Sequence, residues 1–123
     1  MPQHGIRVFH CDDSEAFTRL VGHWLGEHDD LQLVGVAHTH AAAMAAVGLA
    51  RPDVVLLDTM GSPGDDTLLR AIRDAAPGAR VIVYSGYVSL VDTNELGGGA
   101  DAYLPKADDE DALVATIRRV ART

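Results

Sequence analysis

Cysteine is almost absent from this chain of 123 residues, which has a single thiol at Cys11. One cysteine excludes an internal disulfide and fits a reducing compartment. Long hydrophobic runs are missing as well, both at membrane-spanning length and as the apolar part of a secretion signal. We therefore expect a cytoplasmic protein with no membrane partner.

Basic and aromatic residues are also scarce. The chain has 10 Lys and Arg against 18 Asp and Glu, a formal net charge of −8, and only 5% aromatic residues. An acidic balance of this kind argues against direct nucleic-acid binding. The few aromatic side chains leave the core to Leu, Val, Ile and Ala. Hydrophobic residues still make up 47% of the chain, which is enough for one packed domain over residues 1–123.

The hydrophobic pattern predicts alternating strands and helices. Short apolar runs indicate buried strands at Ile6–Cys11, Leu31–Ala37, Val54–Asp58, Arg80–Ser85 and Asp101–Leu104. Apolar residues at helical spacing indicate helices that include Phe17–Leu25, His40–Ala50, Leu68–Ile72, Val88–Leu96 and Leu113–Val120. Such alternation with short connections predicts an α/β fold with helices on both faces of a parallel sheet. We expect a doubly wound, flavodoxin-like sheet of five parallel strands, in the order 2-1-3-4-5, with five helices.

Polar side chains follow four of the predicted strands. Asp12 and Asp13 follow the first strand, Asp58 ends the third, Ser85 ends the fourth, and Lys106 lies just beyond the fifth. Ligands of open parallel sheets bind at the edge formed by the carboxyl ends of the strands. We therefore expect these side chains to converge there, although none of them is needed to build the sheet.

The acids at this edge require a compensating cation. Two carboxylates about 4 Å apart repel by roughly 4 kcal/mol at an effective dielectric constant of 20, and Lys106 offsets only one charge. The candidate ligands are hard oxygens without His or Cys, which favours Mg²⁺ over zinc. Asp13 is expected to ligate the metal directly, and Asp12 to hold a metal-bound water. Since Mg²⁺ commonly accepts phosphate oxygens, the site is predicted to receive a phosphoryl group.

Asp58 is the candidate nucleophile, because a carboxylate can accept a phosphoryl group as an aspartyl phosphate. Mg²⁺ and Lys106 would then stabilise the phosphoryl oxygens, and the Ser85 hydroxyl would donate a hydrogen bond to one of them. Alone, Asp58 is also compatible with a capping carboxylate, and Lys106 with a solvated lysine. The combination of acids, hydroxyl and amine favours the phosphoacceptor interpretation.

This combination resembles the receiver domain of two-component response regulators over essentially the whole chain. The resemblance includes the sequence Tyr103-Leu104-Pro105-Lys106 around the fifth strand. The segment from Asp30 to Asp58, together with GADAYLPK, is most similar to the NarL/LuxR-type branch. The resemblance implies that Asp58 is the phosphoacceptor and that the Met60 carbonyl joins the acids in binding Mg²⁺.

The resemblance also implies a switch and a set of partners. Ser85 and Lys106 would contact the phosphoryl group, and Tyr103 matches the aromatic residue whose rotamer follows the Ser85 movement. The donor would be a sensor histidine kinase or a phosphotransfer protein. The last strand and its flanking helices would form the face that partners bind, including a second copy in a homodimer. The domain would catalyse only its own phosphorylation and dephosphorylation, so we do not expect an enzyme.

Alternatives remain at several positions. The family has Met-Pro three and four residues after the phosphoacceptor, where this chain has Gly61-Ser62. This departure leaves open a degenerate receiver that binds partners without phosphorylation. A small aspartyl phosphatase would need an acid where Met60 stands, and a flavodoxin-like cofactor binder would need a phosphate-binding loop in place of Asp12-Asp13. Residues 1–123 would hold no output domain, as a stand-alone receiver or as part of a longer regulator.

Two further groups of residues have ordinary structural explanations. Tyr103 in a short edge strand is also compatible with simple half-buried packing. The histidine pairs His23 with His28 and His38 with His40 lack a third ligand nearby, so we expect solvated side chains rather than a metal site.

Overall fold

The computed structural model describes residues 5–58, 67–86, 100–106 and 109–122. The described residues form strands β1 (Ile6–Cys11), β2 (Leu31–Ala37), β3 (Val54–Leu57), β4 (Arg80–Ser85) and β5 (Ala102–Pro105). They form helices α1 (Glu15–Gly26), α2 (His40–Ala50), α3 (Thr67–Ala75) and α5 (Glu110–Ala121). The helix predicted over Val88–Leu96 lies outside the described residues.

The five strands form one parallel sheet in the order β2-β1-β3-β4-β5, which confirms the predicted sheet and strand order. Three predicted boundaries, in two strands, were wrong by one residue. Strand β3 ends at Leu57, and β5 runs from Ala102 to Pro105. Proline is tolerated at the end of β5 because this strand lies at the edge of the sheet, where a missing N–H leaves no neighbouring strand unpaired.

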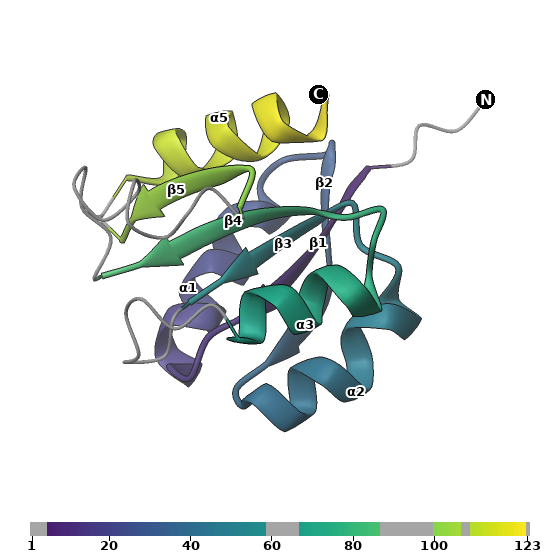
Figure 1. The fold of residues 1–123 in the computed structure, drawn as a ribbon. Coiled ribbons are helices and arrows are strands. Elements are labelled where there is room, and N and C mark those ends of the chain that lie inside the picture. Colours follow the sequence, from purple (N-terminus) through teal and green to yellow (C-terminus); the bar gives the residue numbers. More distant parts are fainter. Residues whose placement is uncertain (1–4, 59–66, 87–99, 107–108, 123) are drawn as a thin grey trace.

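Helices cover both faces of the sheet, with α1 and α5 on one face and α2 and α3 on the other (Figure 1). Strand β3 is buried along its whole length and alternates between the two layers. Val54 and Leu56 pack in the core beneath α1 and α5, whereas Val55 and Leu57 pack in the core beneath α2 and α3. This two-sided burial explains why the central strand is continuously apolar in the sequence.

The helices begin where side chains accept hydrogen bonds from otherwise unpaired backbone N–H groups. Ser14 caps α1, Thr39 caps α2 and Asp109 caps α5. Since each of these helices follows the carboxyl end of a strand, their N-terminal ends lie toward the same edge of the sheet. Among the described residues, no helix combines the length and apolar character needed to cross a membrane.

Candidate functional site

The carboxyl edge of the sheet is built by backbone hydrogen bonds that continue one residue beyond the strands. The Asp58 N–H donates to the Cys11 carbonyl at 2.9 Å, and the Lys106 N–H donates to the Ser85 carbonyl at 3.0 Å. The Asp12 N–H donates to the Ala37 carbonyl at 2.9 Å. These bonds fix the backbone of each polar residue beside its neighbour, so the side chains meet without the help of long loops.

Three carboxylates meet at this edge. Asp12, Asp13 and Asp58 each offer an oxygen, and the three oxygens lie within 4.8 Å of one another. Asp12 is fully buried and Asp58 is 5% exposed, while Asp13 is open to solvent. The Oδ1 atom of Asp58 is buried and accepts no hydrogen bond from the described residues. The cluster therefore concentrates negative charge around an oxygen that has free lone pairs.

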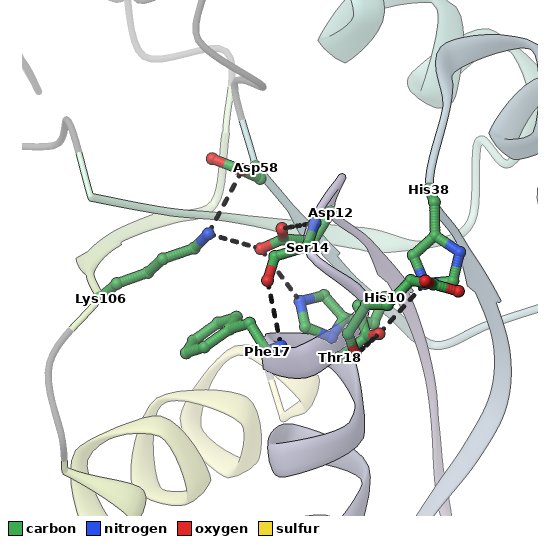
Figure 2. Close-up of polar contacts among 9 residues, drawn as sticks. His10, Asp12, Ser14, Phe17, Thr18, His38, Asp58 and Lys106 are labelled. Atoms are coloured by element: carbon green, nitrogen blue, oxygen red, sulfur yellow. Dashed lines mark hydrogen bonds and ion pairs between the residues drawn. The ribbon is translucent and has the colours of Figure 1, made fainter.

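Lys106 balances part of this charge. Its Nζ lies 2.6 Å from Oδ2 of Asp12 and 3.3 Å from Oδ2 of Asp58, and 4.5 Å from the centroid of the Phe17 ring (Figure 2). Burial alone would lower the pKa of Lys106, but the hydrogen bond with Asp12 and the charges of Asp58 and Asp12 outweigh it, so the pKa is raised. The ammonium group therefore stays charged at neutral pH.

The first turn of α1 holds Asp12 in place. Oδ1 of Asp12 accepts a hydrogen bond from the Ser14 N–H at 2.8 Å. The Ser14 hydroxyl oxygen in turn accepts from the Phe17 N–H at 3.1 Å, which starts the helix. One local turn, of the kind that Asp and Ser favour, therefore orients the carboxylate and places the Phe17 ring beneath Lys106.

The remaining predicted site residues have different outcomes. Ser85 is fully buried at the end of β4, where it pairs in register with Pro105 of β5. Tyr103 is half-buried on β5, and its hydroxyl oxygen accepts a hydrogen bond from the Ala100 N–H at 3.4 Å. Met60 lies outside the described residues, so the structure does not bear on its carbonyl.

Two residues of the site were missed in the sequence. His10 is fully buried beneath Asp12, and its Nε2 lies 3.8 Å from Oδ2 of Asp12. Phe17 contacts Lys106 through its ring, although the sequence pattern assigned it only to the apolar face of a helix. The alternation of side chains along a strand could have predicted the position of His10. The extended chain continues from β1 to Asp12, so the side chains of residues 10 and 12 lie on the same face of the sheet.

The expectation for the other histidines was only partly right. The His23 side chain is 75% exposed, as expected for a solvated histidine. His28 is half-buried instead, with Nε2 3.0 Å from Oε2 of Glu110 and Nδ1 3.4 Å from Nη2 of Arg118. This environment arises because His28, just after α1, meets two residues of α5. Among the described residues, the only cluster suited to a metal is the acidic one.

Comparisons with known proteins agree with this architecture. The sequence matches the response regulator receiver domain family over residues 8–118. It is 37% identical over 123 residues to a protein-glutamate methylesterase/protein-glutamine glutaminase of Nocardioides sp., covering 94% of this chain and 33% of the relative. It is 34% identical over 105 residues to the DNA-binding transcriptional activator DevR/DosR of Mycobacterium tuberculosis, covering 82% of this chain and 48% of the relative.

A solved structure gives the same result. The signal receiver domain of the putative response regulator NarL from Mycobacterium tuberculosis superposes with a TM-score of 0.84 at 25% identity, over 97% of this chain and 98% of that domain. NarL/LuxR-type regulators are thus among the relatives, as predicted, and so are methylesterase-type proteins. The chain spans a third to a half of the length of the two curated relatives described above.

Proposed function

Because the chain belongs to the response regulator receiver domain family, we propose that it accepts a phosphoryl group on Asp58 from a histidine kinase or phosphotransfer protein, with the help of Mg²⁺. The observation that carries this proposal is the arrangement around Lys106. One ammonium group bridges Asp12 and Asp58, at the point where three carboxylate oxygens lie within 4.8 Å of one another. This arrangement supports the proposal that the site receives a metal ion together with a phosphoryl group.

The residues present fit a Mg²⁺ ion. All the side-chain donors are carboxylate oxygens, the ligand type that Mg²⁺ prefers, and Oδ1 of Asp58 is buried without a hydrogen-bond donor among the described residues. Asp13 and Asp58 would ligate the ion directly, Asp12 would do so through water, and the Met60 carbonyl would complete the protein ligands. When bound, Mg²⁺ would neutralise negative charge on the phosphoryl oxygens.

The positions of the side chains support the following course of phosphoryl transfer. A carboxylate oxygen of Asp58 attacks the phosphorus of a phosphohistidine, forming an acyl phosphate as the P–N bond breaks and the donor imidazole leaves with its electron pair. Lys106, already 3.3 Å from Asp58, is placed to follow the charge that develops on the phosphoryl oxygens. The hydroxyl of Ser85, on the neighbouring strand end, would donate a hydrogen bond to one of these oxygens.

The signal would leave the site through β4 and β5. Movement of Ser85 toward the phosphorylated Asp58 would change the surroundings of Tyr103, which moves between exposed and buried rotamers. The face formed by β5 and its flanking helices, including the helix proposed over Val88–Leu96, would present this change to a partner or to a second copy of the chain. The only reactions catalysed would be the domain's own phosphorylation and dephosphorylation.

The proposal concerns residues 1–123 as one cytoplasmic receiver domain. The relatives carry names as different as a methylesterase and a DNA-binding activator, and the receiver site would serve either kind of output. We propose that the domain acts through protein partners and does not itself bind nucleic acid, since its formal net charge is −8.

Intact mass measured after incubation with a small acyl phosphate tests the proposal. The expected result is the gain of one phosphoryl group in the presence of Mg²⁺, with no gain in metal-free buffer or in the Asp58→Asn variant. Binding of beryllofluoride, a stable phosphoryl mimic, is measured beside it because a short-lived adduct escapes detection by mass. A protein that neither gains mass nor binds beryllofluoride would be a degenerate receiver, and the proposal would be wrong.

A further inference from the structure

His10 is an exception to the apolar packing on its face of the sheet. It is fully buried on β1, and neither ring nitrogen has a hydrogen-bond partner among the described residues. A buried polar group without a partner costs free energy. A leucine or valine would fill this layer without that cost. Unlike them, the imidazole carries an N–H that can donate a hydrogen bond.

The ring is held against one oxygen of Asp12. The Phe17 ring packs edge-on to it, with centroids 6.0 Å apart, and the Tyr84 ring lies at 6.3 Å. Between these neighbours, Nε2 of His10 lies 3.8 Å from Oδ2 of Asp12 (Figure 2). That distance is about 1 Å longer than a normal hydrogen bond, so a small shift of either side chain would form one.

Oδ2 of Asp12 is the same oxygen that Lys106 approaches at 2.6 Å. The other oxygen, Oδ1, is already occupied by the Ser14 N–H. Among the described residues, Lys106 and His10 are therefore the two donors beside Oδ2. If Lys106 leaves this oxygen, His10 is the group that remains.

The imidazole of His10 can donate a hydrogen bond in either protonation state. A neutral imidazole carries one N–H. A carboxylate accepts hydrogen bonds, so the nitrogen that faces Asp12 is the one expected to hold the proton.

We propose that His10 is a positioning residue, whose Nε2–H bonds to Oδ2 of Asp12 when Lys106 moves toward a phosphoryl group on Asp58. Phosphorylation increases the negative charge at Asp58, and Lys106 already contacts that side chain. Without His10, the buried Asp12 would lose its partner at Oδ2 as the site fills. With His10, the carboxylate keeps the orientation in which it holds a metal-bound water. This inference rests on the proposed function.

Histidine NMR tests the hydrogen bond directly in the unaltered protein. Spectra of ¹⁵N-labelled histidine distinguish the two neutral tautomers, and the His10→Gln spectrum identifies the signals of His10 among the six histidines. We expect the Nε2–H tautomer, with its proton resonance moving downfield when Mg²⁺ and beryllofluoride are added. The Nδ1–H tautomer, or an unchanged Nε2–H resonance in the loaded protein, would overturn the proposal.

A variant set separates positioning from packing. Mg²⁺ affinity is measured by calorimetry with beryllofluoride present. Loss of such an outer partner typically weakens metal binding about 10-fold or more, so His10→Leu should bind more weakly by about that factor, whereas His10→Gln, which keeps an N–H donor, should recover most of the affinity. Val8→Ala, on the same buried face of β1, should lower thermal stability and leave the affinity unchanged.

The outcomes distinguish this inference from the proposed function. If the wild-type protein binds Mg²⁺ and beryllofluoride and His10→Leu binds them equally well, only the role of His10 is wrong. If Mg²⁺ binding is weakened equally in His10→Leu, His10→Gln and Val8→Ala, the role of His10 is also wrong, since packing alone would explain the effect. If the wild-type protein binds neither ligand, the proposed function fails and the role of His10 fails with it.

Discussion

The Lys106 ammonium lies closer to Asp12 than to Asp58, at 2.6 Å from the Oδ2 of the first and 3.3 Å from the Oδ2 of the second. In this state, one side-chain cation holds together two acids that would otherwise repel each other. A metal ion bound by the same acids would be repelled by the positive charge of Lys106. The two cations therefore oppose each other until a phosphoryl group supplies further negative charge.

Replacement of Lys106 by Met should tighten Mg²⁺ binding in the absence of any phosphoryl mimic. Removing one positive charge a few ångströms from the ion should increase affinity by about tenfold. The variant should nevertheless take up beryllofluoride more weakly, because one partner of the phosphoryl oxygens is lost. Lys106→Arg keeps the charge and serves as the control, with Mg²⁺ affinity near wild type. Weaker Mg²⁺ binding by Lys106→Met, measured by calorimetry, would contradict this account.

Replacement of Asp13 by Asn should stabilise the metal-free protein. Asp13 is the exposed member of a cluster whose oxygens lie within 4.8 Å of one another. Solvent screens its repulsion, so the free energy of unfolding should rise by about 1 kcal/mol. Addition of Mg²⁺ should stabilise the wild-type protein more than the variant, because only the wild type keeps all three carboxylates that are proposed to hold the ion.

Urea denaturation with and without Mg²⁺ measures both effects. Asp29→Asn removes another exposed acid, from the turn before β2, and serves as the control. Asp29→Asn should change neither the free energy of unfolding without Mg²⁺ nor the stabilisation by Mg²⁺ by more than about 0.5 kcal/mol. A variant of Asp13 that is less stable without metal and equally stabilised by Mg²⁺ would show that the three acids do not share an ion.

Replacement of Gly35 by Ala should destabilise the sheet. A Cβ atom on Gly35 would lie 2.7 Å from Cε2 of Phe9, its register partner on β1, and the Phe9 side chain is fully buried. Such overpacking typically costs about 1–3 kcal/mol. Gly26→Ala is the matched control, since nothing lies within 4 Å of its Cβ position at the end of α1. Thermal unfolding should place Gly35→Ala below the wild type and Gly26→Ala at or above it.

The pair between Arg118 and Asp30 should be visible in a pH titration. The side-chain hydrogen bonds of Arg118, at 2.8 and 2.9 Å, lower the pKa of Asp30 from its ordinary value of 3.8. The folded-state pKa is the lower one, so the pair stabilises the protein fully above pH 3.8, and the stabilisation is lost as the pH falls through the folded-state pKa.

Arg118→Gln should therefore raise the pKa of Asp30 toward 3.8, as followed by the NMR shift of its carboxyl carbon. Arg119→Gln removes the adjacent, exposed arginine and should leave the titration of Asp30 unchanged. The effect on stability should be small, because solvent reaches both members of the pair, whose side chains are 37% (Arg118) and 49% (Asp30) exposed. If Asp30 titrates identically in Arg118→Gln and the wild type, the hydrogen bonds of Arg118 do not lower its pKa.

Tyr103 should report phosphorylation. Its hydroxyl oxygen accepts a hydrogen bond from the Ala100 N–H at 3.4 Å, a long contact that a change of rotamer would break. Ring resonances of Tyr103 should therefore shift on addition of Mg²⁺ and beryllofluoride, and the same addition should leave them in place in Asp58→Asn. A ring that keeps one environment in both states would show that Tyr103 is a packing residue and not part of the switch.

The sheet and the acidic cluster could be predicted because both are local in the sequence. An apolar run such as Val54–Leu57 specifies a buried strand, and the polar residue that follows it marks the strand end. Parallel pairing then brings Asp58 beside Asp12. The end of β5 was predicted one residue too early. Pro105 belongs to the strand because it lies in register with Ser85 of β4, and the local sequence does not express this pairing.

Other parts of the structure depend on packing that no local pattern expresses. Phe17 contacts Lys106 because the lysine side chain extends from the end of β5 across the carboxyl edge of the sheet to Asp58 and Asp12, near the start of α1. Asp30 and Arg118 are separated by 88 residues and meet because α1 and α5 cover the same face. His10 was within reach of a strand-alternation argument, but its lack of hydrogen-bond partners became evident only in three dimensions.

Chemical mapping of the modified residue shows whether Asp58 is the phosphoacceptor. Borohydride reduces an aspartyl phosphate to homoserine, which marks its position permanently. After treatment with a small acyl phosphate and Mg²⁺, followed by borohydride and peptide mass spectrometry, we expect homoserine at position 58 and unmodified Asp12 and Asp13. Homoserine at position 12 or 13, or no homoserine in a protein that has gained a phosphoryl group, would contradict it.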